Sequence, residues 1–245
     1  MSDLSARVLA GDARAIARAI SLVENESDEG KALLTEMSSR PRRAYRIGVT
    51  GPPGAGKSTL VDRLAAALRP ASSVGILAVD PSSPFSGGAV LGDRLRMQSH
   101  SEDEGVFIRS MATRGHLGGL ARATTDAAVI LDAAGKDFVI IETVGVGQAE
   151  VDIVRTADVS IVVLVPGAGD EVQALKAGIM EIANIFVVNK ADREGADRVV
   201  SAVESYLSLE SKGVRPQIVK TVATTGAGIP ELVEAINAFR AGPRR

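Results

Sequence analysis

The sequence predicts an α/β fold in which a doubly wound, mostly parallel sheet follows an N-terminal helical extension. From Tyr45 onward, short runs rich in β-branched residues alternate with amphipathic segments of helical period. Several of these runs are apolar throughout, as expected of strands that helices cover on both faces. A glycine-rich sequence stands between the first run and the helix after it. Such alternation forms parallel sheets, and their ligands bind beyond the carboxyl ends of the strands.

The helical extension is expected to occupy residues 1–42, and residues 43–245 are expected to form the catalytic domain. Apolar residues recur at roughly helical spacing across residues 3–24, which predicts one or two amphipathic helices. A second helical pattern ends at about Ser38. The domain after it is expected to hold strands at 45–50, 74–79, 106–110, 138–141, 159–165, 185–189 and 217–222. Its helices are expected near residues 57–69, 118–134, 171–182, 194–209 and 230–240.

Composition excludes several classes of protein. The chain has no cysteine, so disulfides and thiolate metal sites are excluded. A formal net charge of -2 gives no support for binding to nucleic acid or to anionic membranes. The longest strongly apolar run, residues 159–165, is far too short to span a bilayer. We therefore expect a cytoplasmic protein with neither a nucleic acid nor a membrane as partner.

The sequence GPPGAGKS, residues 51–58, matches the Walker A pattern of P-loop NTPases. It follows a predicted strand and opens a predicted helix, whose dipole adds positive potential at the phosphates. Lys57 would reach the terminal phosphates and assist catalysis, and the Ser58 hydroxyl would bind Mg²⁺. The expected contacts to the nucleotide phosphates are Gly51, Pro52, Pro53, Gly54, Ala55, Gly56, Lys57, Ser58 and Thr59. A glycine-rich turn without a ligand is the simpler alternative.

The sequence NKAD, residues 189–192, directly follows the strand predicted at 185–189. A carboxylate at Asp192 can accept hydrogen bonds from both N1–H and the 2-amino group of guanine. Adenine offers neither donor there, so the site should discriminate by about 10⁴-fold. Asn189 would support the 6-oxo and N7 side of the base, and the stem of Lys190 would cover one face. The ligands are therefore expected to be GTP and GDP.

A turn after the last strand completes the expected base site. Val222, Ala223 and Thr224 stand where GTPases commonly place a Ser-Ala turn whose backbone N–H contacts the guanine oxygen. Val222 replaces the usual Ser, so the side-chain contact is missing, but a main-chain contact from Ala223 survives. A simple exit from the strand into a loop is the open alternative.

Three acidic residues are candidate Mg²⁺ ligands beside Ser58. Asp80 and Glu142 end predicted strands, and Asp93 lies in the segment between two of them. Mg²⁺ binds few carboxylates and keeps several waters, so we expect ligation to change between nucleotide states. Each carboxylate taken alone could instead be a helix cap or a solvated turn residue.

The residues that would act on the γ-phosphate are less sharply defined. Gly145, three residues after Glu142, could give its N–H to the γ-phosphate. Glu142 also stands where GTPases usually carry Asp, and we assign it a catalytic part. Arg96, Arg109 and Arg114 are candidates for stabilising charge in the transition state, and Arg96 is slightly favoured.

These segments together resemble the MeaB/ArgK family of small GTPases, the metallochaperones associated with methylmalonyl-CoA mutase. The resemblance runs from about residue 4 to 240, and DPSSPFSGG and ETVGVGQ are its most specific segments. It implies slow GTP hydrolysis, Mg²⁺-linked switch acids at Asp80, Asp93 and Glu142, and a third mobile segment at residues 167–176. The implied partner is a cobalamin-dependent acyl-CoA mutase, for which the family gates delivery of adenosylcobalamin and removal of damaged cofactor.

Family members commonly continue into a C-terminal helical arm that builds a homodimer, whereas this sequence stops at Arg245. A homodimer is possible, but we expect that arm to be absent. Three alternatives stay open: a nickel-insertion maturation GTPase, a P-loop small-molecule kinase, and a nucleotide switch without useful turnover. The first would need Cys and His ligands, and the second would lack NKAD.

Overall fold

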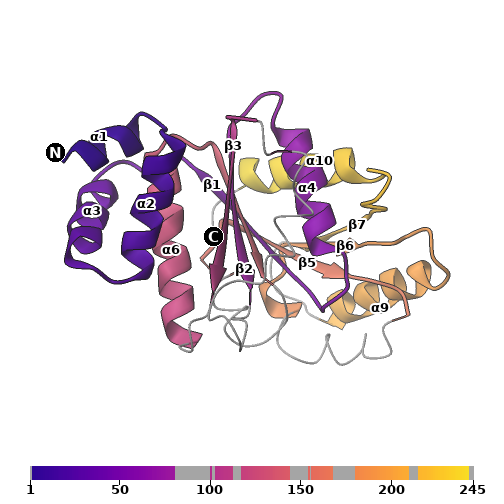
Figure 1. The fold of residues 1–245 in the computed structure, drawn as a ribbon. Coiled ribbons are helices and arrows are strands. Elements are labelled where there is room, and N and C mark those ends of the chain that lie inside the picture. The colour runs from indigo at the N-terminus through magenta and orange to yellow at the C-terminus, as the bar shows by residue number, and fades with distance from the viewer. Residues whose placement is uncertain are drawn as a thin grey trace. The chain divides into compact units, whose positions relative to one another are not determined.

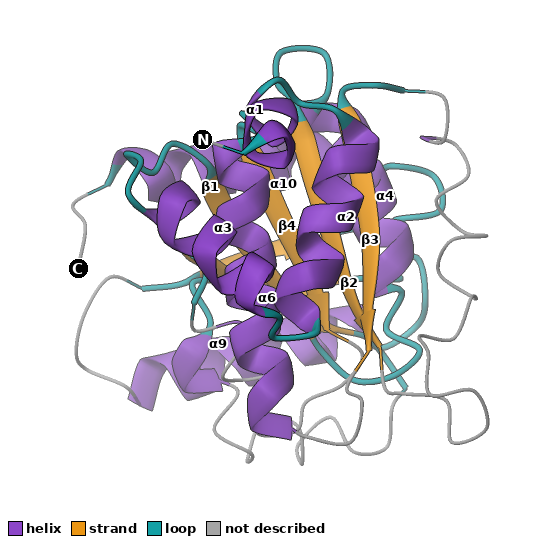
Figure 2. Cartoon of the chain, turned by 60° about the vertical axis from the view of Figure 1, so that its left-hand side comes forward, coloured by secondary structure: helices purple, strands orange, loops and turns teal. Residues whose placement is uncertain are grey.

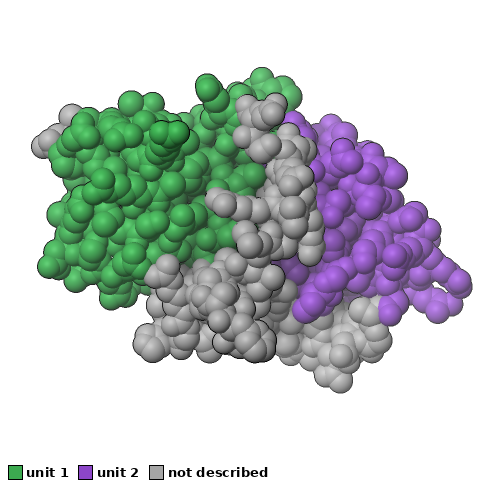
Figure 3. All heavy atoms as spheres, in the orientation of Figure 1, with its two compact units in different colours: residues 1–46, 68–141 green, residues 47–67, 142–245 purple. Residues whose placement is uncertain are grey.

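The computed structural model of the chain describes residues 2–80, 100, 103–112, 117–143, 154, 156–167, 180–209 and 215–242. The chain divides into two compact units, which Figure 3 distinguishes by colour. Unit 1 comprises residues 1–46 and 68–141, and unit 2 comprises residues 47–67 and 142–245. This division concerns compactness, and the expected boundary between residues 42 and 43 stays a prediction.

Unit 1 begins with three helices: α1 (Asp3–Leu9), α2 (Ala13–Glu24) and α3 (Asp28–Ser38). Each is preceded by a residue whose side chain accepts a hydrogen bond from the third backbone N–H beyond it, namely Ser2, Asp12 and Ser27. Leu4, Val8, Ile16 and Ile20 are buried, as their helical spacing predicts. Residues 3–24 thus form two helices. Gly11, whose φ is 79°, adopts the left-handed conformation in the turn between them.

The rest of unit 1 is a parallel pair of strands with one long helix. Strand β2 (Val74–Asp80) pairs with β3 (Val106–Ala112), in a register that runs from Val74 opposite Val106 to Asp80 opposite Ala112. Helix α6 (Leu117–Ala133) packs on this pair, and its Leu131 lies against Gly75, where a Cβ would be 2.8 Å from Leu131 Cδ1. Figure 2 shows α2, α3 and α6 gathered on one side of β2 and β3.

Unit 2 contains the elements that surround the Walker A sequence. Strand β1 (Tyr45–Thr50) and β4 (Phe138–Thr143) start in unit 1 and end in unit 2. Unit 2 continues with α4 (Lys57–Leu68), β5 (Val159–Leu164), the 3-10 turn η2 (Met180–Ile182), β6 (Ile185–Val188), α9 (Ala196–Leu209), β7 (Gln217–Lys220) and α10 (Ile229–Ala241). The pairs β1–β5, β5–β6 and β6–β7 are all parallel.

The strands follow one another in the order β3-β2-β4-β1-β5-β6-β7. Figure 1 labels these strands except β4, which is labelled in Figure 2. From β1 the chain extends this sheet first toward β3 and later toward β7, which is the doubly wound arrangement that the sequence predicts. β4, β5 and β6 are buried along their whole length, in agreement with their largely apolar sequences.

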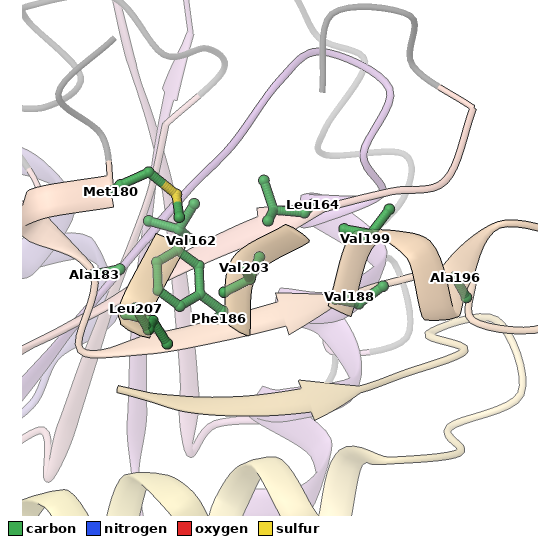
Figure 4. Packing of buried hydrophobic residues seen from close by; sticks show 10 residues of the cluster. All are labelled: Val162, Leu164, Met180, Ala183, Phe186, Val188, Ala196, Val199, Val203 and Leu207. Carbon is green, nitrogen blue, oxygen red and sulfur yellow. The ribbon is translucent and has the colours of Figure 1, made fainter. Parts of the chain in front are cut away.

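Helix α9 closes the core of unit 2 against β5 and β6. Phe186 on β6 is fully buried, and Val199 and Val203 of α9 pack into the same cluster. Figure 4 shows these side chains between the helix and the two strands. Burying a side chain of this size contributes about 1.5–3 kcal/mol, so the cluster fixes the strand that leads into residue 189.

The predicted strands and helices are confirmed wherever the chain is described, with ends that shift by at most two residues. The helix expected at 171–182 lies mostly outside the described residues, and only η2 falls within it. Among the described helices, none is long and apolar enough to cross a membrane.

Candidate nucleotide-binding site

The Walker A loop follows β1, and its backbone geometry requires glycine at two positions. Gly51 has a φ of 149°, and a Cβ there would lie 2.3 Å from the carbonyl oxygen of Val163 on β5. Gly56 has a φ of 84°, and its Cβ would lie 2.6 Å from Asn189 Nδ2. The loop therefore packs against two other segments through bare backbone, which any side chain would push apart.

Lys57 is the first residue of α4, and only 6% of it is exposed. Its ammonium donates hydrogen bonds to the carbonyl oxygens of Gly51, at 2.8 Å, and Pro52, at 3.0 Å. The charge is thus held across the loop at the positive end of a helix dipole. The Lys57 ammonium and the amino terminus of α4 together make this loop suited to bind an anion.

Ser58, the next residue, faces a carboxylate from β4. Its hydroxyl donates to Glu142 Oε1 at 2.7 Å, and Glu142 is only 3% exposed. One residue further on, Thr143 Oγ1 lies 3.0 Å from Thr50 Oγ1 at the end of β1. The Ser58 hydroxyl in the first turn of α4 and the Glu142 carboxylate near the end of β4 form the kind of all-oxygen donor set that suits Mg²⁺.

Asn189 follows β6 and joins three segments of the site. Its Nδ2 donates to the carbonyl oxygen of Ala55 in the Walker A loop, at 2.8 Å. Its Oδ1 accepts from Thr221 Oγ1 at 3.0 Å and from the backbone N–H of Ala223 at 3.1 Å. Because Asn189 is 2% exposed, these bonds are shielded from water. In this structure its amide braces the site, and the expected contact with the base stays a prediction.

Lys190 and Asp192 extend from the same turn toward solvent. Lys190 has a φ of 55°, and its ammonium donates to the carbonyl oxygen of Gly54 at 2.7 Å, so its stem crosses the Walker A loop. Asp192 is exposed, as a group that binds a ligand must be before the ligand arrives. The backbone N–H of Ala191 donates to the Thr221 carbonyl at 3.0 Å, which ties this turn to the end of β7.

The turn at residues 221–227 forms the third wall. The backbone N–H of Val222 donates to Ala227 at 2.9 Å, which closes the turn, and Ala223 is buried beneath it. The Ala223 N–H, expected at the guanine oxygen, points to Asn189 Oδ1 here. Arg63 of α4 donates to the Thr224 carbonyl at 3.1 Å. Sequence reasoning missed Arg63, because its partner is distant along the chain.

Several of the expected site residues cannot be placed. Arg96, Asp93, Gly145 and Arg114 lie outside the described residues, as do residues 168–176 of the expected third mobile segment. Asp80 ends β2 as predicted, but its side chain is not described.

Arg109 can be placed. Its guanidinium forms an ion pair with Glu24 and donates to Ser21 Oγ at 2.9 Å, both on α2. A charge already paired with a carboxylate is a poor candidate for stabilising a transition state, and Arg109 instead fastens α2 to β3.

Comparison with known proteins decides the family. The model of the family "Methylmalonyl Co-A mutase-associated GTPase MeaB" matches residues 16–243. This chain belongs to the MeaB family.

Several relatives of this MeaB-family protein are named as GTPases. A putative GTPase of Pyrococcus horikoshii is 56% identical over 242 residues, which are 96% of this chain and 76% of that protein. The mouse mitochondrial "Methylmalonic aciduria type A homolog" is 36% identical over 94% of this chain and 60% of its own length.

Solved structures agree with the fold. The crystal structure of a protein titled "LAO/AO transport system kinase" is 30% identical, with a TM-score of 0.77 over 97% of this chain and 74% of that one. The hydrogenase maturation factor HypB of Archaeoglobus fulgidus, at 17% identity and a TM-score of 0.60, shares the fold alone. The family match and the names of the relatives, together with this fold, make the MeaB-family chain a P-loop GTPase.

Proposed function

We propose that this GTPase is a chaperone of a cobalamin-dependent acyl-CoA mutase, whose supply of adenosylcobalamin it gates and whose damaged cofactor it helps to remove. The observation that carries the proposal is the match to the MeaB model over residues 16–243. The name of the mouse relative, which refers to methylmalonic aciduria, supports the same class of partner. We also propose that the protein acts in the cytoplasm.

Guanine selectivity belongs to the proposal. Asp192 is exposed beside a loop that Asn189 joins to the phosphate-binding segment, so a nucleotide held at the Walker A loop would present its base edge there. A carboxylate at that edge matches the two donors of guanine and is repelled by the lone pair of adenine N1. The positive charge of Lys57 and the dipole of α4 would hold the phosphates.

Mg²⁺ would be held by Ser58 and Glu142, whose oxygen atoms lie 2.7 Å apart in a buried setting. Asp80 and Asp93 would join them in some nucleotide states. The ion supplies charge neutralisation at the β- and γ-phosphates. The chain itself orients the phosphates through the backbone of residues 51–59, with Gly145 at the γ-phosphate and Arg96 as a source of further positive charge.

The test measures coupling between nucleotide state and mutase. Mutase affinity is determined with GDP and with a non-hydrolysable GTP analogue, and GTP hydrolysis is measured with and without mutase. We expect the two affinities to differ and the mutase to accelerate hydrolysis. Linkage then requires that the mutase change the affinity for GTP by the factor by which GTP changes the affinity for the mutase.

The segment 167–176 supplies the variant for this test. Asp170→Ala combined with Lys176→Ala should weaken the acceleration and leave intrinsic turnover unchanged. Asp28→Ala combined with Lys31→Ala removes an exposed pair of the same charges from α3, where the two side chains lie 3.5 Å apart, and serves as the matched control. Equal mutase affinities in both nucleotide states, with hydrolysis unaffected by mutase, would exclude the chaperone role.

A further inference from the structure

Unit 1 contains a cavity of about 700 Å³ at the amino-terminal end of β3. Its walls come from the turn between α1 and α2, from the start of β3, and from the turn between α6 and β4. Phe107 and Ile16, both buried, supply apolar surface. Nucleotides bind at the opposite, carboxyl ends of parallel strands, so this cavity has no part in the GTP site.

Six charged residues line the cavity, and the charges of three of them are balanced by ion pairs. Arg7 pairs with Asp12 at 3.2 Å. Asp103 accepts from Arg69 at 2.8 Å and from the Gly105 N–H at 2.8 Å, and the Arg69 bond lowers the pKa of Asp103. The other charged groups in the lining are Arg14, Glu104 and Lys136, of which two are cations and one is an anion.

Lys136 is the buried member of that group. It is 8% exposed, and its ammonium donates to the Gly105 carbonyl at 3.1 Å. An ammonium has three donors, and in the described part of the chain Lys136 forms no ion pair. One oxygen of the neighbouring Asp137 carboxylate accepts from the Ser73 N–H and hydroxyl at 2.7 and 2.8 Å. Asp137 and Asp103 favour the charged form of Lys136 but only partly offset its burial. Burial accordingly lowers the pKa of Lys136.

A buried cation with unused donors is costly unless something outside the chain compensates it. The cavity beside Lys136 gives an anion a route to it, and Arg14 at the exposed rim adds charge of the same sign. Phe107 and Ile16 would contact an apolar part of the same ligand. We propose that this cavity binds a small organic anion, a carboxylate or phosphoryl group on an apolar body, which Lys136 anchors.

The test uses the full chain with its Walker A site filled by excess GDP. Benzoate and phenyl phosphate are the anionic probes, and benzyl alcohol is the neutral probe of similar shape. Binding is followed by NMR through the ring signals of Phe107. We expect the anions to shift these signals and benzyl alcohol to leave them unchanged. Whichever of benzoate and phenyl phosphate binds with the higher affinity identifies the preferred anionic group.

Lys136→Met should lower the affinity for the anion by about tenfold or more, the usual effect of removing a charged hydrogen-bond donor. Lys31→Met, an exposed lysine of α3, is the matched control and should bind like the wild type. If Lys136→Met does not fold, Arg14→Gln takes its place, and a several-fold loss is expected. Wild-type affinity in the folded variant, or anions that leave Phe107 unshifted in the wild type, would overturn the proposal.

Discussion

The Ser58 hydroxyl donates a hydrogen bond to Glu142 Oε1 at 2.7 Å, and this bond joins the first turn of α4 to the penultimate residue of β4. Both groups are buried, so neither can rearrange freely in water. A cation that binds the pair finds its oxygen donors already positioned, and less entropy is lost on binding.

The Glu142→Gln variant should raise the Mg²⁺ concentration needed for half-maximal GTP hydrolysis by about tenfold or more. The amide keeps the shape of the side chain and removes the charge that attracts the cation. Hydrolysis is measured across a Mg²⁺ titration, and GDP affinity without Mg²⁺ should change little. Glu204→Gln on the exposed face of α9 is the control. An unchanged Mg²⁺ requirement would remove Glu142 from the metal site.

The Asp192→Asn variant should lose affinity for GTP and gain affinity for xanthosine triphosphate, whose 2-oxo group accepts where guanine donates. Calorimetry with both nucleotides and ATP measures the change. Asp197→Asn, an exposed carboxylate at the start of α9, should keep the wild-type preference. A wild type that binds ATP as tightly as GTP would refute the role of Asp192.

The Asn189→Ala variant should lower the free energy of unfolding by about 2–4 kcal/mol. It leaves the Ala55 carbonyl and the Ala223 N–H without their partner in a buried setting, and each such loss costs about 1–3 kcal/mol. Denaturant unfolding of the nucleotide-free protein measures it. Asn237→Ala, on the exposed face of α10, should change stability by less than about 0.5 kcal/mol. If Asn189→Ala and Asn237→Ala have the same free energy of unfolding, the hydrogen bonds of Asn189 contribute little to stability.

The Lys136→Met variant should be more stable than the wild type at neutral pH in the absence of anions. Burial lowers the pKa of Lys136 from 10.5, so below its folded pKa the native state carries the full cost of a buried charge. Between that pKa and 10.5 the unfolded chain binds more protons, and wild-type stability rises with pH. The advantage of the variant should therefore shrink across that range in unfolding curves. An advantage that grows with pH would contradict the buried-charge reading.

The sequence predicts the elements of this fold well because several strands are largely apolar and the three N-terminal helices are preceded by capping residues. The run at 159–165 is such a strand, and Asp12 and Ser27 mark two helix starts. The Walker A and NKAD residues could be found for a related reason, since their chemistry depends on a short stretch of neighbouring residues.

Contacts between distant segments could not be predicted in the same way. The hydrogen bond of Asn189 to Ala55 spans 134 residues, and that of Arg63 to Thr224 spans 161. The identity of neither Asn189 nor Arg63 indicates which distant residue it contacts. Arg109 shows the same limit for a candidate catalytic residue. The sequence around it suggests a role in catalysis but does not reveal its ion pair with Glu24.

The three bonds of Asn189 also set how this site can be redesigned. A single amide side chain links the Walker A loop to the turn after β7, which we propose contacts the base. Base preference can be altered at Asp192 without disturbing that link, whereas any replacement of Asn189 alters both ends together. To make this GTPase bind an unnatural nucleotide, the exposed carboxylate of Asp192 should therefore be changed and the buried amide of Asn189 kept.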